Sequence, residues 1–314
     1  MSLDTPVAFL IFKRPDTTER VFQAIREAKP KKLLVVADGG RDSEEQEKCQ
    51  QARAVIEKVD WDCEVLKNYS ETNLGCKQRV SSGLDWVFSQ VEEAIILEDD
   101  CVPHSSFFQY CQELLERYRD DNRIMHIGGN NFLCSRTNLE YSYYFSSYPH
   151  CWGWATWSRA WQYYDINMKL WPLVQDYYSL YEVFYTDEER LRRKNIWEKT
   201  YQGKIDTWDY GWFFTIRSQN GMSILPRENL ITNIGFGIEG THTQGSNNRR
   251  ANLPISGVQF PLIDPPFAMR DSEADYNYEK MHYKPKPTVI GGLKSWIIDR
   301  VTHKTIKKII SKKQ

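Results

Sequence analysis

The segment formed by residues 94–103, AIILEDDCVP, constrains the fold more than any other stretch of this chain. Its first four residues are all apolar, which is typical of a short parallel strand buried on both faces. Three carboxylates follow directly, on Glu98, Asp99 and Asp100, before a proline turn. In open α/β sheets, ligands bind just beyond the carboxyl ends of parallel strands. We therefore expect the acids at a site where a hard cation compensates their charge, or, as the alternative, in a solvated loop that caps the next helix.

Other apolar runs predict that this strand belongs to a larger α/β sheet. Strands are expected at residues 7–12, 33–37 and 63–66, and helices at 19–28, 44–59, 76–90 and 105–118. Strands that alternate with helices in this way indicate βαβ units and a mostly parallel, Rossmann-like central sheet flanked by helices. After about residue 124 the sequence becomes rich in aromatic residues, with a charged helix expected at 180–201 and a strand at 223–226.

Size and charge limit the classes of function. A chain of 314 residues suits one large α/β domain or two smaller ones. The formal net charge of −1 argues against nucleic acid as the main partner. Aromatic residues make up 14% of the chain, including eleven Trp, and crowd between residues 141 and 214. Such density is found in sugar-binding clefts, but an ordinary aromatic core would look the same.

The cysteines and the N-terminus bear on the compartment. The seven cysteines are scattered, without a CxxC pair, so neither a zinc site nor a disulfide framework is indicated. Free thiols fit a reducing cytoplasm. The first residues show no basic region followed by an apolar segment, and no window reaches the roughly 18 apolar residues of a spanning helix. We expect a cytoplasmic protein, with a possible place on the inner face of the plasma membrane.

The C-terminal tail provides the reason for a membrane expectation. Residues 284–314 hold nine Lys and Arg residues and one acid, a net charge of +8, which leaves −9 on residues 1–283. Apolar residues alternate with these cations from Leu293 to Ile310, as in a basic amphipathic helix that lies on an anionic membrane. The alternatives are a disordered basic tail and a helix docked on the acidic body.

Several motifs in order along residues 6–245 resemble nucleotide-diphospho-sugar glycosyltransferases of the GT-A fold. A strand ends at Arg14, a second at Asp38-Gly39, Asn73-Leu74-Gly75 precedes a helix, and Glu98-Asp99-Asp100 matches a DxD-type motif. Residues 95–108, with Trp208-Asp209, are similar to the inverting animal N-acetylglucosaminyltransferase I family. The whole chain resembles bacterial glycosyltransferases with a Phe-Lys/Asn-Arg-Pro-Asp-Thr-Thr start and an Asn-Ile-Gly-Phe-Gly…Thr-His-Thr end.

The resemblance implies roles for the residues at the strand ends. Asp100 would bind Mn²⁺ or Mg²⁺ against the diphosphate of a nucleotide-sugar donor, with a UDP-sugar favoured. Asp99 would reach the ribose or the cation through water, and Glu98 the sugar or the loop. Asp38 would contact the nucleobase. Arg14 would contact base or phosphate, or form a surface ion pair instead.

Further implied roles lie on residues later in the chain or on helices. Arg79 would reach the diphosphate, or pack its stem against the sheet. Asp209 would be the general base of an inverting transfer, with Asp206 as its substitute, or a helix cap. His242 would bind the cation, or only cap a loop. Trp154, in the Trp152-Gly153-Trp154 loop, would cover the donor. His150 is a less favoured candidate for a position near the donor sugar or the acceptor.

These observations together predict one GT-A domain with a nucleotide-sugar-binding half at 1–130, an acceptor-binding half at 131–270 and the basic amphipathic tail at 284–314. The resemblance implies a metal-dependent glycosyltransferase in bacterial surface polysaccharide synthesis, with a glycan or lipid-linked glycan as acceptor. A non-catalytic carbohydrate-binding protein is the alternative from another class. A sugar-phosphate nucleotidyltransferase is a further alternative, ranked lower because residues 12–16, FKRPD, contain no glycine to cradle a triphosphate.

Overall fold

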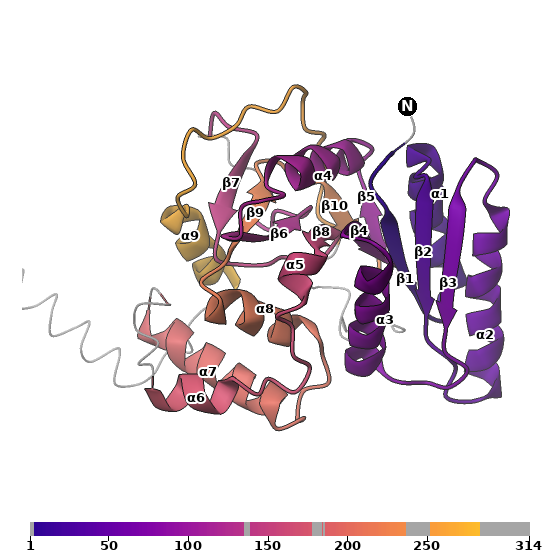
Figure 1. The fold of residues 1–314 in the computed structure, drawn as a ribbon, viewed down its shortest axis with the longest axis horizontal. Helices are drawn as coiled ribbons and strands as arrows, with labels where there is room; N and C mark the ends of the chain where they lie inside the picture. Colours follow the sequence, from indigo (N-terminus) through magenta and orange to yellow (C-terminus); the bar gives the residue numbers. More distant parts are fainter. Residues whose placement is uncertain (1–2, 135–138, 178–183, 185, 237–251, 283–314) are drawn as a thin grey trace, which may run out of the picture. The chain divides into compact units, whose positions relative to one another are not determined.

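The computed structural model describes residues 3–134, 139–177, 184, 186–236 and 252–282. Its main sheet has eight strands in the order β3-β2-β1-β4-β8-β6-β9-β7 (Figure 1). The first four strands are all parallel, and they are β3 (Glu64–Tyr69), β2 (Lys32–Ala37), β1 (Val7–Ile11) and β4 (Glu93–Glu98). Every residue of β1 is buried, as its unbroken apolar sequence predicts. The predicted α/β class with a mostly parallel sheet flanked by helices is confirmed.

The remaining four strands form a mixed half of the same sheet. They are β8 (Trp154–Trp157), β6 (Ile124–Gly128), β9 (Met222–Pro226) and β7 (Tyr143–Ser146). Strand β8 runs antiparallel to both β4 and β6, and β7 runs antiparallel to β9. A second, two-stranded sheet pairs β5 (Cys101–Pro103) with β10 (Ile231–Asn233) in antiparallel register. It brings a segment more than 120 residues further along the chain next to the acid cluster.

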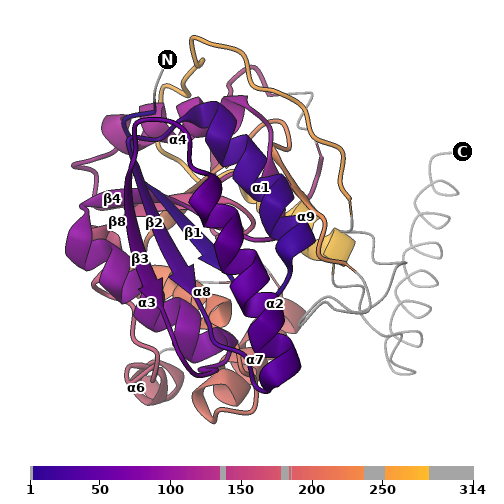
Figure 2. The same cartoon turned by 90° about the vertical axis from the view of Figure 1, so that its right-hand side faces the viewer.

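Helices cover both faces of the sheet. On one face lie α1 (Pro15–Ala28), α2 (Ser43–Ala54), the 3₁₀ turn η1 (Val55–Lys58) and α4 (Ser106–Arg117). On the other lie α3 (Cys76–Gln90), α5 (Ser158–Trp161) and α8 (Asp209–Ser218). Figure 2 shows α3 on the opposite side of the parallel strands from α1 and α2. The other helices are α6 (Trp171–Tyr177), α7 (Asp187–Tyr201) and α9 (Ser272–His282).

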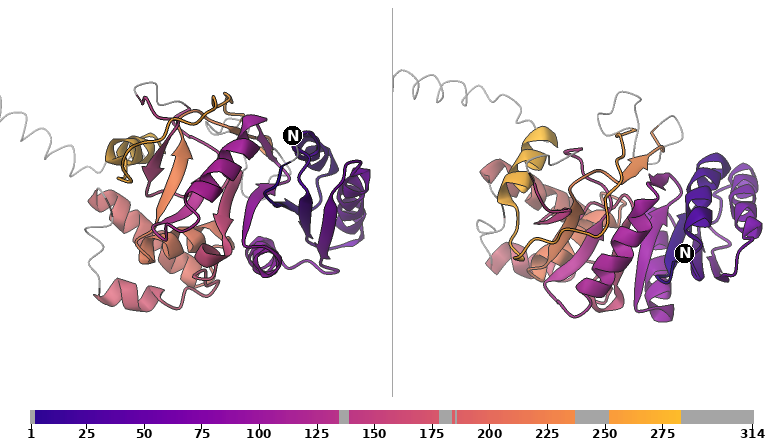
Figure 3. Two further views of the ribbon diagram at one scale, coloured as in Figure 1. Left: turned by 45° about the horizontal axis from the view of Figure 1, so that its top comes forward. Right: turned by 90° about the horizontal axis from the view of Figure 1, so that it is seen from above.

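The segment at residues 252–269 packs along the second half of the sheet without regular structure. The backbone N–H of Val258 donates to the hydroxyl of Ser106 at the start of α4, over 3.1 Å. That of Ile263 donates to the hydroxyl of Ser142 over 2.9 Å. Figure 3 shows this segment in yellow-orange running past α4. These bonds fix an irregular, proline-containing segment on the surface between Asn252 and the start of α9.

Some element boundaries differ from those expected. Helix α1 begins at Pro15 rather than at residue 19, because proline is favoured in the first turn, where its missing N–H costs nothing. Helix α2 begins at Ser43, one residue earlier than expected, and Asp42 caps it by accepting from the backbone N–H of Glu45. The aromatic-rich region, for which little was predicted, contains β6, β7, β8 and α8.

Residues 1–276 form one compact unit, and the eight-stranded sheet passes through both predicted halves because β4 pairs with β8. All seven cysteines are free thiols, as expected. Across the described ranges, no helix has both the length and the apolarity needed to cross a bilayer. The predicted tail at 284–314 lies outside the described residues.

Candidate functional site

A cavity of about 400 Å³ opens at the carboxyl ends of β1, β2 and β4. Strands β1 and β4 are neighbours, while the chain leaves β1 toward β2 and β3 on the other side, so the cavity lies at the topological switch point of the sheet. Its ionisable lining consists of Lys13, Arg14, Asp38, Arg41, Cys76, Arg79, Glu98, Asp99, Asp100, Cys151, Asp206 and Asp209. The structure thus brings together seven of the predicted site residues.

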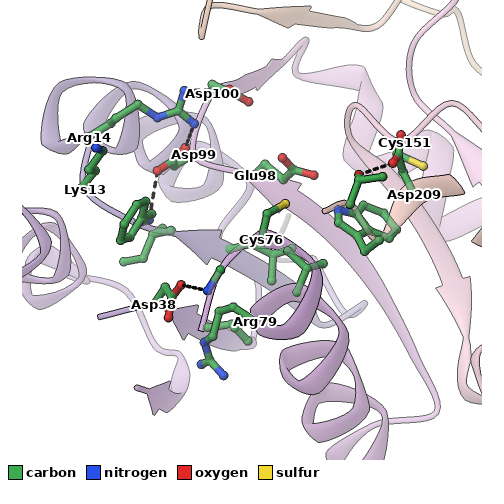
Figure 4. A pocket seen from close by; sticks show the side chains of 18 of the residues that line it. Lys13, Arg14, Asp38, Cys76, Arg79, Glu98, Asp99, Asp100, Cys151 and Asp209 are labelled. Atoms are coloured by element: carbon green, nitrogen blue, oxygen red, sulfur yellow. Dashed lines mark hydrogen bonds and ion pairs between the residues drawn. The ribbon is translucent and has the colours of Figure 1, made fainter. Parts of the chain in front are cut away.

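An arginine closes the acid cluster at one end of the cavity. Arg14 Nη2 donates to Asp99 Oδ1, and Nη1 lies 3.0 Å from Asp100 Oδ2. The second oxygen of Asp99 accepts from the backbone N–H of Phe12 over 3.1 Å. Figure 4 shows Arg14 reaching across from the end of β1 to both acids. Burial disfavours the cation on Arg14, but the two carboxylates more than offset this and raise its pKa. Arg14 is therefore a partly buried ion-pair partner of the acid cluster rather than part of a surface ion pair.

Asn233 at the end of β10 is a site residue that the sequence analysis did not select. Its Nδ2 donates to Asp100 Oδ1 over 3.2 Å, and the backbone N–H of Ile234 donates to the carbonyl of Asp100 over 2.9 Å. A Cβ on Gly235 would stand 2.1 Å from Asp100 Oδ2, so only glycine fits this close approach. The Asn-Ile-Gly order was noticed in the sequence, but its contact with Asp100 depends on the pairing of β10 with β5.

Glu98 lies between two acidic groups. Its carboxyl group faces the cavity, with Asp99 and Asp100 to one side and Asp209 to the other in Figure 4. Burial, reinforced by Asp100 and Asp99, raises the pKa of Glu98 to about 8. Burial also raises the pKa of Asp99 to about 6, against the opposing effect of Arg14. The cluster thus holds protons near neutral pH unless additional positive charge enters the cavity.

Asp38 organises the neighbouring loop. Its Oδ1 accepts from the backbone N–H groups of Gly39, over 3.0 Å, and Leu74, over 2.9 Å. Its Oδ2 accepts from the N–H of Gly75 and from Asn73 Nδ2, each over 3.1 Å. Burial raises the pKa of Asp38, and these backbone donors lower it in part. The carboxylate lines the cavity, but a nucleobase that contacted it would have to share or replace one of these donors.

Arg79 is placed by the sheet rather than by the acid cluster. Its Nε donates to the carbonyl of Ala37 over 3.1 Å, and Nη2 donates to the carbonyl and side-chain oxygens of Asn68. These acceptors lie at the carboxyl ends of β2 and β3. Burial lowers the pKa of Arg79. The structure agrees with the alternative in which Arg79 packs against the sheet, and Figure 4 shows it on the Asp38 side of the cavity.

Asp209 faces the cavity from the first turn of α8. Its Oδ1 accepts from the hydroxyl of Thr207 and from the backbone N–H of Tyr210, the latter over 2.9 Å. These bonds hold one oxygen, so the carboxylate is oriented by its own helix start. Asp206, Thr207 and Trp208 line the same wall. Trp208 is only 3% exposed and stacks on Trp154 in the aromatic core.

The two tryptophans of the Trp-Gly-Trp loop have different surroundings. Trp154 belongs to β8, is fully buried, and stacks on Trp208 with ring centroids 5.4 Å apart. It cannot cover a ligand, so the expectation for Trp154 is corrected, while Trp152 lines the cavity instead. Strand β8 begins only at Trp154, and Gly153, with φ +60°, turns the chain just before it, so Trp152 does not share the orientation of Trp154.

Two histidines behind this loop are structural. His126 Nδ1 accepts from Trp212 Nε1 over 3.2 Å, so the proton lies on Nε2, which donates to the carbonyl of His150 over 3.1 Å. Burial lowers the pKa of His126 to about 3. His150 Nδ1 lies 3.1 Å from the carbonyl oxygen of Asn130, and the side chain is buried outside the cavity lining. His242, a predicted cation ligand, lies outside the described residues.

The acid cluster offers some, but not all, of the ligands that a divalent cation needs. Among the residues that the structure describes, no three His, Cys, Asp or Glu side chains converge as a ready-made metal site. Asp100 and Glu98 nevertheless supply the carboxylate oxygens that Mg²⁺ and Mn²⁺ prefer. Glu98 faces the cavity, and a ligand phosphate and water complete the shell of such ions in phosphate sites. The oxygen ligands fit a divalent cation once Arg14 no longer pairs with Asp100.

Comparisons with known proteins add the following. No family model matches the chain, and neither does any curated protein. A solved UDP-glucose pyrophosphorylase, complexed with UDP-glucose, is 9% identical, covers 73% of this chain and 92% of its own, with a TM-score of 0.36. An inositol-1-phosphate CTP transferase from T. maritima is 10% identical, covers 79% and 94%, with a TM-score of 0.39.

These names correct one prediction. Both proteins transfer nucleotidyl groups, whereas the resemblance implied a glycosyltransferase, and nothing found here is specific to the N-acetylglucosaminyltransferase I family. The finding overturns the predicted glycosyltransferase class and agrees better with the nucleotidyltransferase alternative. At these TM-scores the likeness assigns no activity to this chain by itself. What is shown is a Rossmann-like α/β fold with its cavity at the switch point.

Proposed function

We propose that the switch-point cavity binds a nucleotide sugar together with Mg²⁺ or Mn²⁺, and that the protein is a transferase acting on that ligand. The observation that carries the proposal is the position of Glu98, Asp99 and Asp100 at the end of β4, with Arg14 opposite them at the end of β1. In sheets of this kind, that edge is where nucleotides bind.

The charge balance of the cavity supports a cation. Six carboxylates line it, on Asp38, Glu98, Asp99, Asp100, Asp206 and Asp209, against four cations, on Lys13, Arg14, Arg41 and Arg79. A nucleoside diphosphate adds further negative charge to this acidic surface. All four cations already have partners in the protein: Arg79 binds strand carbonyls, Lys13 and Arg41 pair with Glu45, and Arg14 pairs with Asp99 and Asp100. A divalent cation held by Asp100 would remove the repulsion between the acids and the diphosphate.

The two ends of the cavity suggest how the ligand would lie. The Asp38 end offers the ordered Asn73–Gly75 loop and apolar Val36, a surface for a nucleobase. The acid cluster would take the diphosphate through the cation. The sugar would then reach the wall of Trp152 and Asp209, where a carboxylate and an aromatic face suit its hydroxyl groups.

The residues around the cavity would play different parts in the reaction. A bound cation would neutralise charge on the diphosphate as a Lewis acid. Asn233 and the Ile234 N–H hold Asp100 in one orientation from two sides. Asp209 lines the cavity, its Oδ1 is held by Thr207 and the Tyr210 N–H, and it would be the carboxylate that takes up a proton from a second substrate.

Nucleotidyl transfer is one candidate for the reaction of this transferase, because both solved structures named above belong to enzymes of that kind. One feature opposes it. The loop from β1 to α1 consists of Phe12, Lys13 and Arg14, without glycine, and the Phe12 N–H already donates to Asp99. Such a loop offers few backbone donors for a triphosphate.

Calorimetric titration with UDP, GDP, ADP and CDP, each with and without Mn²⁺, tests the binding proposal. We expect one nucleotide to bind only with the cation, and Asp100→Asn to lose that binding by at least about tenfold. Glu47→Gln, an exposed acid on α2, is the matched control and should bind as the wild type does. Binding that ignores both cation and Asp100 would refute the proposal.

The reaction is then identified from products. The nucleotide sugar that binds is incubated with pyrophosphate and Mg²⁺, and release of nucleoside triphosphate is followed. In nucleotidyl transfer, pyrophosphate attacks the α-phosphorus and sugar 1-phosphate leaves. Triphosphate formation that depends on Asp100 would establish this reaction. Its absence in a protein that binds the nucleotide sugar would exclude nucleotidyl transfer and leave the binding proposal intact.

A further inference from the structure

Arg14 occupies the position from which a cation would have to approach Asp100. Its Nη1 lies 3.0 Å from Asp100 Oδ2, the oxygen that faces the Gly235 loop. Asp100 Oδ1 is taken by Asn233 Nδ2 at 3.2 Å, and the Cys101 thiol lies 3.3 Å away. Both oxygens of Asp100 therefore have partners, and of these partners Arg14 is the one that carries charge.

The surroundings leave little room for Arg14 and a cation together. A Cβ on Gly235 would stand 2.7 Å from Arg14 Nη1, so the loop after β10 closes directly over the guanidinium. Asp99, the other partner of Arg14, is 3% exposed. The guanidinium is thus enclosed between two acids and a backbone loop, where a second positive ion would be repelled at short distance.

We infer that Arg14 is the resident counter-ion of the acid cluster, that a divalent cation displaces it from Asp100, and that the displaced guanidinium then binds the diphosphate. This inference rests on the proposed function, since it assumes the cation and the nucleotide. A buried acid pair without a counter-ion is costly, and Arg14 offsets the charge of Asp99 and Asp100 until a cation takes over that part. A guanidinium is also well shaped to bind phosphate oxygens with two parallel hydrogen bonds.

The exchange predicts an unusual pair of effects. A cation that binds alone has to break the Arg14–Asp100 ion pair, so Arg14 lowers the affinity of the protein for the cation. The diphosphate gains a charged partner in the displaced guanidinium, so Arg14 raises the affinity of the protein for the diphosphate. Cation and nucleotide then favour each other's binding through one side chain.

The test is titration of the intact protein with Mn²⁺ alone, and with UDP (or whichever nucleotide the panel identifies) at saturating Mn²⁺. Arg14→Gln should bind Mn²⁺ alone more tightly and the nucleotide more weakly, each on the order of tenfold. Lys13→Gln is the matched control, because Lys13 is the next residue, lines the same cavity and pairs with Glu45 instead of the cluster. It removes the same charge and should change Mn²⁺ affinity by less than about threefold.

The outcomes separate the two proposals. If wild-type protein binds neither Mn²⁺ nor nucleotide, the proposed function fails. If the wild type binds both, but Arg14→Gln weakens Mn²⁺ binding or raises it no more than Lys13→Gln does, the exchange is overturned while the function stands. Should Arg14→Gln not fold, as judged by circular dichroism, Arg14→Lys keeps the charge with a single contact. It should show the same two opposite changes at smaller size, and their absence would overturn the inference.

Discussion

The two halves of the main sheet differ in strand direction and in the side chains that form their cores. The half β3-β2-β1-β4 is parallel, and the carboxyl ends of its apolar strands β1, β2 and β4 meet at the cavity. The half β8-β6-β9-β7 is mixed, and its core is made of large rings such as Trp154, Trp161 and Trp212. The parallel half carries Arg14, Asp38 and the acids on its own strand ends, whereas the mixed half sends single residues across from loops and helices. The difference shows that one half supplies the charges and the other restrains and covers them.

The largest loss of stability is expected for a substitution in the aromatic core of the mixed half. Trp154→Ala removes a fully buried ring that stacks on His126, with centroids 5.1 Å apart. We expect a loss of about 3–5 kcal/mol in the free energy of unfolding, measured in urea. Trp152→Ala should cost no more than about 2 kcal/mol and should mainly weaken nucleotide-sugar binding. Equal losses of stability in the two variants would contradict the assignment of Trp154 to the core and Trp152 to the cavity.

The next largest effect is expected where the loop after β10 approaches Asp100. Gly235→Ala places a Cβ 2.1 Å from Asp100 Oδ2, so the loop or the carboxylate must move. We expect a loss of about 1–3 kcal/mol in stability and, by calorimetry, a cation-dependent nucleotide affinity at least about tenfold lower. The control is Gly203→Ala, where φ is +70° and nothing lies within 4 Å of the added methyl. It should lose some stability through backbone strain but keep the nucleotide affinity.

A smaller effect tests whether Asp38 holds the loop within the parallel half. Asp38→Asn replaces one of the oxygens that accept from Leu74 and Gly75 with a donor. We expect a loss of about 1–3 kcal/mol in stability, because a buried N–H is left unsatisfied. Hydrogen exchange should show faster exchange at residues 74 and 75 than in the wild type. Unchanged exchange there, with weaker nucleotide binding, would instead favour direct contact between Asp38 and the nucleobase.

The smallest expected effect is a pH dependence of the acid cluster. The folded protein holds the pKa of Glu98 at about 8 and that of Asp99 at about 6, both above their ordinary values. The folded state therefore binds more protons than the unfolded state, and stability falls as the pH rises from about 4 to 8. Because the cavity is open to solvent, we expect a fall of only about 1 kcal/mol, which Glu98→Gln or saturating Mg²⁺ should reduce. Thermal unfolding across this range measures it, and stability that rose with pH would contradict the protonation of the cluster.

Much of the parallel half could be predicted from local sequence. The apolar runs at residues 7–12, 33–37 and 94–97 lie within or next to β1, β2 and β4, and the acids do lie at the end of β4. Such strands are buried on both faces, so hydrophobicity alone marks them. In the mixed half the same signal fails, because aromatic residues serve both strands and helices there. The helix α8 and the strands β6 to β8 were missed for this reason.

The sequence by itself therefore determined the fold class, the strand that carries Glu98, Asp99 and Asp100, and the neighbourhood of Arg14 and Asp38. Only the tertiary structure decided that Arg14 pairs with the acids, that Asn233 holds Asp100, and that Trp152 rather than Trp154 faces the cavity. Strand and helix signals are local properties of a few successive residues. The pairing of β10 with β5 and the crossing of Arg14 to Asp99 join residues 85 or more positions apart, and such contacts follow from how the whole chain packs.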